Sequence, residues 1–118
     1  MYTFICYEKC GTCRKAEKWL KDNGIAYEKR FIDRDNPSAE ELKEWVPASG
    51  RELRKFFNTS GRLYRELDVK NRLGTMSDEE IYSLLATDGM LVKRPILVGE
   101  GTVLSGFKEE EWTEKLKK

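Results

Sequence analysis

The sequence TFICYEKCGTCRKAEKWL, residues 3–20, decides the start of the fold and holds all three cysteines of the chain. Residues 2–7 are rich in aromatic and β-branched side chains and predict a strand. Residues 11–23 place apolar side chains on one helical face, and Gly24 follows as a stop signal. Residues 25–32 alternate apolar and charged side chains and predict a second strand. Two strands joined by a helix within about 30 residues are typical of a parallel βαβ unit.

Helices are predicted for the middle of the chain. Residues 38–41 (SAEE) and 77–80 (SDEE) each match a capping box, in which a serine begins a helix and a glutamate three residues later reaches back to it. Between these two helices, the apolar spacing in residues 53–57 and 63–67 predicts two short ones.

The end of the chain predicts a β-hairpin followed by a helix. RPILV (94–98) and TVLSGF (102–107) are strand-like and are joined by a glycine-containing turn. A last helix from about residue 108 would bury Trp112 and Leu116. The order βαβ, helices, ββα predicts an α/β thioredoxin-like fold: a four-stranded mixed sheet with an all-helical insert. At 118 residues we expect a single domain, 1–118, with a helical subdomain at about 36–90.

Composition narrows the classes of partner. Lys plus Arg is 22 and Asp plus Glu is 21, a net charge of +1, without the basic excess of nucleic-acid or anionic-membrane binders. No apolar run approaches the ~20 residues that span a bilayer, and no signal peptide is recognised. We therefore expect a cytoplasmic protein with no membrane and no direct nucleic-acid partner. In that reducing compartment, cysteines favour thiol chemistry or metal binding over structural disulfides.

The chain contains no histidine. This excludes Ser-His-Asp and Cys-His catalysis and removes the commonest metal ligand. A nucleophile must therefore be activated by other means.

Cys10 and Cys13 form a Cys-X-X-Cys motif at the predicted strand-to-helix junction. Cys10 would lie just before the helix, where free N–H groups and the helix dipole stabilise a thiolate. Cys13 lies in the first turn, at an α-carbon separation of about 5–6 Å that a disulfide can bridge. Gly11 would let the backbone turn tightly, and Thr12 would cap or line the loop. This placement predicts a redox pair.

Three other interpretations of the cysteines fit the sequence less well. The spacing of Cys6, Cys10 and Cys13 matches that of radical enzymes with an iron–sulfur cluster, but those enzymes need a barrel of ~200 residues or more. A structural zinc site wants four Cys or His ligands, and only three are available. Cys10 and Cys13 could also be incidental half-buried thiols. Cys6 shares a strand face with Phe4 and is interpreted as a small core side chain. No metal site is predicted.

Four motifs, CGTCRKAEKWL, FFNTSGRLYRELD, GMLVKRPILV and VLSGFKEEEW, together resemble the arsenate reductase (ArsC)-like family of thioredoxin folds. The resemblance covers residues 2–116 and is strongest to the Spx regulators and the small YffB-type reductases. It implies that Cys10 is the nucleophile, and that Arg94, before a cis Pro95, helps to form an anion or thiol-ligand site. By itself an X-Pro bond is usually trans.

Departures from the family pattern refine the expected function. Glutathione-dependent arsenate reductases of this family use three arginines, of which only Arg94 has a counterpart; the others fall at Asn58 and near Gly106-Phe107. Arg54 and Arg62 were considered as substitutes, with Arg62 expected to be a solvated helix charge. The second thiol, Cys13, favours an internal disulfide.

The expected catalytic residues are therefore Cys10, Cys13 and Arg94, and the expected substrate-binding residues are Gly11, Thr12 and Pro95. The resulting hypothesis is a thiol–disulfide oxidoreductase, arsenate reductase-like, without a tightly bound cofactor. Glutathione or a thioredoxin/glutaredoxin-type protein would be its reductant. The alternative is an Spx-like redox-sensing regulator that binds RNA polymerase through its alpha subunit.

Overall fold

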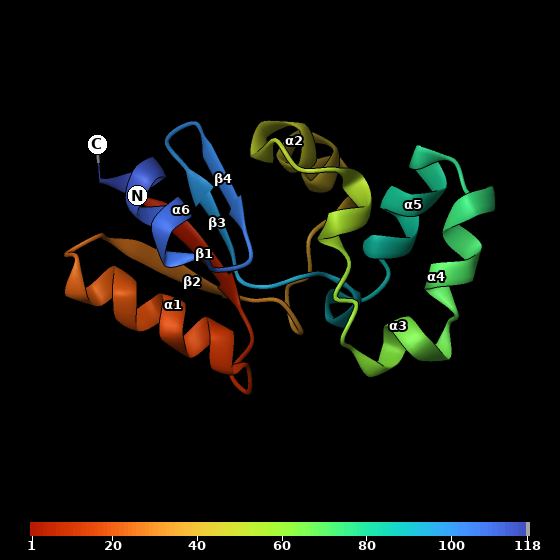
Figure 1. Cartoon of the computed structure of the whole chain (residues 1–118), viewed down its shortest axis with the longest axis horizontal. Coiled ribbons are helices and arrows are strands. Elements are labelled where there is room, and N and C mark those ends of the chain that lie inside the picture. Colours follow the sequence, from red (N-terminus) through yellow and green to blue (C-terminus); the bar gives the residue numbers. More distant parts are fainter. Residues whose placement is uncertain (118) are drawn as a thin grey trace.

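A four-stranded sheet with two helices forms one part of the molecule, and a group of short helices forms the other (Figure 1). The computed structural model describes residues 1–117. Its elements, in chain order, are β1 (Tyr2–Cys6), α1 (Gly11–Asp22), β2 (Tyr27–Phe31), α2 (Ala39–Ser49), η1 (Leu53–Phe56), α3 (Arg62–Glu66), α4 (Val69–Arg72), η2 (Leu73–Thr75), α5 (Asp78–Leu85), η3 (Gly89–Leu91), β3 (Ile96–Gly99), β4 (Thr102–Ser105) and α6 (Glu109–Leu116).

The sheet has the order β2-β1-β3-β4. β1 and β2 are parallel, with Tyr2 opposite Tyr27, as the βαβ prediction requires. β3 is antiparallel to both β1 and β4, and the β3–β4 hairpin pairs Ile96 with Ser105. The predicted α/β class with a four-stranded mixed sheet is therefore confirmed.

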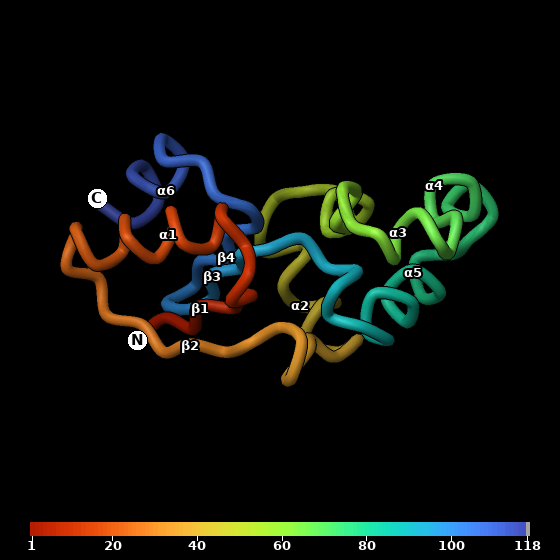
Figure 2. Tube along the Cα trace, turned by 90° about the horizontal axis from the view of Figure 1, so that it is seen from below, coloured from red at the N-terminus to blue at the C-terminus, as the bar shows by residue number. Residues whose placement is uncertain are grey.

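One face of the sheet is covered by α1 and α6, which lie on the same side of it (Figure 2). Strand side chains alternate between faces, so Phe4 and Cys6 pack under α1 while Ile5 points to the other face. Trp19 of α1 and Trp112 of α6 meet edge to face, with ring centroids 6.0 Å apart. We call the residues of this face the α1/α6 cluster; it comprises Phe4, Cys6, Cys13, Ala16, Trp19, Leu20, Leu97, Leu104 and Trp112.

The other face of the sheet packs against the helical insert. Ile5, Ile96 and Val103 from the strands share one buried cluster with Leu42 and Trp45 of α2. This insert cluster continues through η1, α4 and α5, so the short helices gain most of their stability from a shared core rather than from their own length.

Both predicted capping boxes are present. The Ser38 hydroxyl accepts the Glu41 N–H at 3.1 Å, and the Glu41 carboxylate accepts the Ser38 N–H at 3.0 Å. The same exchange between Ser77 and Glu80 begins α5. Each box satisfies N–H groups that the helix itself leaves without partners, which is why a four-residue pattern located these helices.

Some details differ from the expectations. The predicted helix at 53–57 is a short 3-10 helix, and α4 with η2 follows α3 without having been predicted. Leu116 is half-buried rather than buried, whereas Trp112 is fully buried. The expected single domain runs to Lys118, which lies outside the described residues, and its division into subdomains stays a prediction. Among residues 1–117, no helix has both the length and the apolar character needed to cross a membrane.

Candidate active site

Cys10 occupies the N-cap of α1. β1 ends at Cys6, and a turn closed by the Cys10 N–H donating to the Tyr7 carbonyl at 3.1 Å brings the chain to the helix. Cys10 is extended, with φ −101° and ψ 115°, and its Sγ accepts the N–H of Cys13 at 3.3 Å. The first turn of α1 contains no acidic residue. The sulfur therefore sits at the positive end of the helix with a backbone donor aimed at it.

The two thiols have opposite acid–base character. Partial burial would raise the pKa of Cys10, but hydrogen bonds from the Cys13 side chain and backbone and the charge of Arg94 outweigh it, so the pKa is lowered. Burial, together with the neighbouring Cys10 sulfur, raises the pKa of Cys13 to about 12. Cys10 is half-buried and reachable, whereas only 3% of Cys13 is exposed. The pair therefore contains one thiolate-prone sulfur at the surface and one protonated thiol behind it.

Arg94 lies beside this pair, before a cis peptide bond to Pro95, as the resemblance implied. Its guanidinium carbon lies 4.9 Å from the centre of the Tyr7 ring. Its Nε and Nη1 atoms are buried and have no hydrogen-bond partner within residues 1–117. Its positive charge contributes to the lowered pKa of Cys10.

Cys10 and Arg94 open onto a cavity of about 780 Å³ between the sheet and the insert. Four segments supply its walls: the start of α1, the segment around η1, the segment that precedes β3, and the end of β4 with the residues that follow it. The lining residues are Cys10, Thr12, Gly50, Arg51, Glu52, Lys55, Asn58, Ser60, Lys93, Arg94, Ser105, Gly106, Phe107 and Lys108.

The charged residues that line this cavity are mostly basic. Five of its residues are lysine or arginine and one, Glu52, is acidic. Arg51 is already engaged by Glu111 of α6, with which it makes hydrogen bonds of 2.7 and 2.8 Å. The remaining cations line the same cavity as Cys10 and favour an anionic ligand.

The predicted substrate-binding residues are only partly brought together. Thr12 lines the cavity. Gly11 does not line it, and a Cβ built there would meet no atom within 4 Å, so the steric reason expected for this glycine is not found. Pro95 is buried beneath the cavity wall, next to Arg94.

The arginines considered as substitutes do not reach the site. Arg62 is 85% exposed and pairs with Glu66, as a solvated helix charge should. Arg54 is exposed and is not a lining residue, whereas its neighbour Lys55 is. Asn58, which aligns with the first family arginine, does line the cavity.

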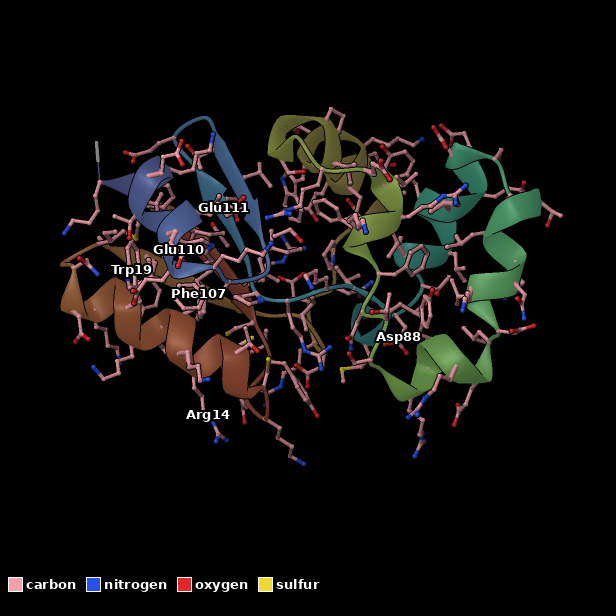
Figure 3. All side chains as sticks on the ribbon, viewed as in Figure 1. Arg14, Trp19, Asp88, Phe107, Glu110 and Glu111 are labelled. Atoms are coloured by element: carbon pink, nitrogen blue, oxygen red, sulfur yellow. The ribbon has the colours of Figure 1, made fainter. Side chains whose placement is uncertain are left out.

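Sequence reasoning had pointed to the neighbourhood of Gly106-Phe107 but missed the other lining residues, which are Gly50, Arg51, Glu52, Lys55, Ser60, Lys93, Ser105 and Lys108. Lys93 directly precedes Arg94, so its proximity to the site was available from the sequence. Phe107 lies against Trp112, with ring centroids 4.9 Å apart. It also lies beside Trp19 of α1, at 6.4 Å between ring centroids (Figure 3). It lines the cavity directly after Gly106, whose φ of +74° turns the chain, and a linear pattern does not reveal this position.

Cys6 belongs to the core, as expected for its strand face. It is 4% exposed, and burial raises the pKa of its thiol to about 11. Within the described residues, no group of three or more Cys, Asp or Glu side chains could hold a metal ion.

The fold and this arrangement of thiols define a thioredoxin-like protein of the ArsC type. The ArsC family model matches residues 6–115, and the chain belongs to that family.

Individual relatives agree with this membership. The chain is similar to YusI of Bacillus subtilis, with 51% identity over 112 residues and 95% of both chains covered. It is also similar to a solved ArsC family related protein from Bacteroides fragilis, with 54% identity, a TM-score of 0.93, and 96% of this chain and 95% of that chain covered. A more distant relative is the global transcriptional regulator Spx 1 of Bacillus cereus, with 29% identity, 94% of this chain and 83% of the relative covered.

Proposed function

We propose that this protein is a cytoplasmic thiol–disulfide oxidoreductase with Cys10 as nucleophile and Cys13 as resolving thiol. The observation that carries the proposal is the opposite shift of the two pKa values across one hydrogen-bonded pair, lowered at Cys10 and raised at Cys13. Such a pair presents a nucleophile before the reaction and keeps its partner protonated until it is needed.

The reaction follows from this asymmetry. The Cys10 thiolate attacks one sulfur of a substrate disulfide, forming a mixed disulfide and releasing the other substrate half as a thiolate. Cys13 then loses its proton, to solvent or to that thiolate, and attacks the Cys10 sulfur. The second substrate half leaves, and the protein retains a Cys10–Cys13 disulfide. Two electrons have moved from the protein to the substrate.

A thiol reductant must return those electrons. Two glutathione molecules, or one thioredoxin- or glutaredoxin-type protein, would reduce the internal disulfide by the same exchange in reverse. Arg94 would stabilise the Cys10 thiolate, both as the nucleophile and as the group released on reduction.

The test is thiol trapping with mass spectrometry in glutathione buffers of graded potential. The wild-type protein should show an internal disulfide that rises with oxidation, and Cys13→Ser should instead retain one glutathione on Cys10. Cys10→Ser should show neither product. Cys6→Ser is the matched control, because its thiol is buried in the core, and it should behave as wild type. Recovery of glutathione on Cys13 rather than Cys10 would contradict the assigned order of attack.

A second candidate is a redox-sensing regulator that acts on RNA polymerase, which the similarity to Spx 1 favours. It would use the same disulfide as a switch without turnover. Co-purification with the polymerase alpha subunit that depends on the state of Cys10 and Cys13 would support it. Turnover of a small disulfide with glutathione, lost in Cys10→Ser, would support the reductase.

A further inference from the structure

Two residues that line the cavity contain three buried donor atoms without partners. They are Nε and Nη1 of Arg94 and the hydroxyl Oγ of Ser105, and within residues 1–117 none of them makes a hydrogen bond. Ser105 is 1% exposed. A buried hydroxyl or guanidinium nitrogen without an acceptor is costly, so such groups are ordinarily found with one. Both residues line the cavity onto which Cys10 opens.

The hairpin holds Ser105 beside Arg94. Ser105 pairs with Ile96 at the end of β4, and the next residue, Gly106, donates its N–H to the Pro95 carbonyl at 2.8 Å. These contacts place the Ser105 side chain along the segment that carries Arg94. The two residues therefore lie side by side in one wall of the cavity.

Lys93 adds a positive charge to the same wall. Its backbone N–H donates to the Phe56 carbonyl at 2.7 Å, which fixes the root of the side chain. A Cβ built on Gly106 would come within 2.7 Å of Lys93 Cε and 3.7 Å of its Nζ, so the lysine lies across the bare glycine. Gly106 also has φ +74°, which a glycine adopts without strain. Among the described residues Lys93 makes no ion pair.

This arrangement differs from a site of three arginines. One of the two other arginine positions is Asn58, and the second falls near Gly106-Phe107, where the side chain of Lys93 lies against Gly106. The donors of Arg94, Ser105 and Lys93 come from one wall of the cavity, and one of them, the Ser105 hydroxyl, is neutral. A carboxylate, with two acceptor oxygens and one charge, matches a guanidinium, a hydroxyl and one ammonium.

We propose that Arg94, Ser105 and Lys93 form a carboxylate-binding subsite beside Cys10, so that the preferred substrates are disulfides carrying a carboxylate close to the sulfur. The inference rests on the proposed reductase function and names its substrate class. Ser105 and Lys93 then determine specificity, whereas Cys10 performs the exchange.

The experiment compares two colour-forming disulfides. Dithiobis(nitrobenzoate) carries a carboxylate on each ring, and dithiodipyridine carries none. In each case Cys10 forms a mixed disulfide, the reagent's S–S bond breaks, and a coloured thiol or thiolate is released. Rates are measured by stopped flow in a Cys13→Ser background, where the second step cannot occur. Because both rates depend equally on thiolate formation, their ratio reports recognition of the carboxylate.

The ratio of the rate with dithiobis(nitrobenzoate) to the rate with dithiodipyridine should fall roughly tenfold in Ser105→Ala and in Lys93→Met. Lys93→Arg should restore much of this ratio. Lys70→Met removes an exposed charge of α4 that does not line this cavity, and it should leave the ratio unchanged. Ser105→Ala should not lower the free energy of unfolding, because the hydroxyl has no partner in the fold to lose.

The possible outcomes separate the two proposals. A ratio that stays at the wild-type value in both Ser105→Ala and Lys93→Met overturns the carboxylate subsite, even if Cys10 reacts rapidly with the neutral reagent. If Cys10 reacts with neither reagent faster than a free thiol does at the same pH, the proposed reductase function fails and the subsite with it.

Discussion

The sheet region and the helical insert contribute differently to the site. The sheet region, with α1 and α6, supplies both thiols and Arg94, the groups that set the pKa of Cys10. The insert supplies Lys55, Asn58 and Ser60, which line the cavity but are not among the causes of the shifted thiol pKa values. The groups that lower the pKa of Cys10 therefore come from one region, and part of the cavity lining comes from the other.

The two regions are also stabilised differently. The α1/α6 cluster is dominated by two tryptophans, Trp19 and Trp112, in edge-to-face contact. The insert cluster is assembled from many short elements. Two ion pairs, Arg30–Glu41 and Arg51–Glu111, join the insert to the sheet region. Substitutions in the α1/α6 cluster, in the insert cluster and at these ion pairs should therefore change the free energy of unfolding by different amounts.

The largest effect is expected from Trp112→Ala. The Trp112 ring is fully buried, packs against Trp19 and Phe107, and donates its Nε1–H to the Gly106 carbonyl at 3.1 Å. Its removal should lower the free energy of unfolding by about 3–5 kcal/mol, measured by urea denaturation. Trp45→Ala in the insert cluster is the matched control and should cost less, because Trp45 is 7% exposed. The reverse order would show that the insert carries the more tightly packed core.

Arg94→Met should reduce the reactivity of Cys10 severalfold at neutral pH. Loss of the guanidinium raises the pKa of Cys10, so the midpoint of the rate against pH for a neutral disulfide should move upward. Lys55→Met removes a lining charge from the insert and should leave this midpoint in place. An equal shift in both variants would mean that the insert also tunes the thiol.

Glu41→Gln should cost about 1–2 kcal/mol of stability at neutral pH. Arg30, only 17% exposed, donates to both carboxylate oxygens at 2.7 and 2.8 Å and lowers the pKa of Glu41 to about 2. The Glu41 side chain is 34% exposed, so screening by water keeps the loss of stability below what the pKa shift would suggest.

The pH dependence of this pair has a definite sign. Because the pKa of Glu41 is lowered on folding, the stabilisation is complete above pH 4.5 and is lost as the pH falls toward 2. Wild-type stability should therefore decline over that window more steeply than that of Glu41→Gln. Glu80→Gln alters a capping box in which no arginine pairs with the glutamate. The pH dependence of its stability should therefore differ less from that of the wild type. Parallel acid titration curves for wild type and Glu41→Gln would contradict the assignment.

The smallest effect is expected from the Arg51–Glu111 pair. Its side chains are 27% and 30% exposed, so the coupling free energy from a double-mutant cycle with Arg51→Gln and Glu111→Gln should stay below about 1 kcal/mol. The Lys43–Glu79 pair, which lies within the insert, is more exposed and should couple still more weakly. A coupling free energy larger for Lys43–Glu79 than for Arg51–Glu111 would contradict this order. Arg51–Glu111 would then no longer be regarded as an energetic link between the two regions.

Much of the fold could be predicted because its signals are local. The capping boxes at Ser38 and Ser77 each satisfy backbone donors within four residues, so they could be identified without knowledge of the fold. The placement of Phe4 and Cys6 on one sheet face follows from the period-2 alternation of strands. In contrast, α4 begins after Asp68 in a left-handed conformation, with φ 51° and no side-chain cap, and offers no such signal.

The candidate site divides in the same way. The position of Cys10 at a helix start, the spacing to Cys13 and the adjacency of Arg94 to Pro95 could be predicted, because each depends on neighbours within a few residues. That Lys93 lies across Gly106, and that Ser105 has no partner within the described residues, follows from the folded chain alone. The tertiary structure also brings Arg51 to Glu111, which is 60 residues away along the chain. Such contacts depend on how the hairpin and the insert pack against each other, and packing joins residues that no local pattern connects.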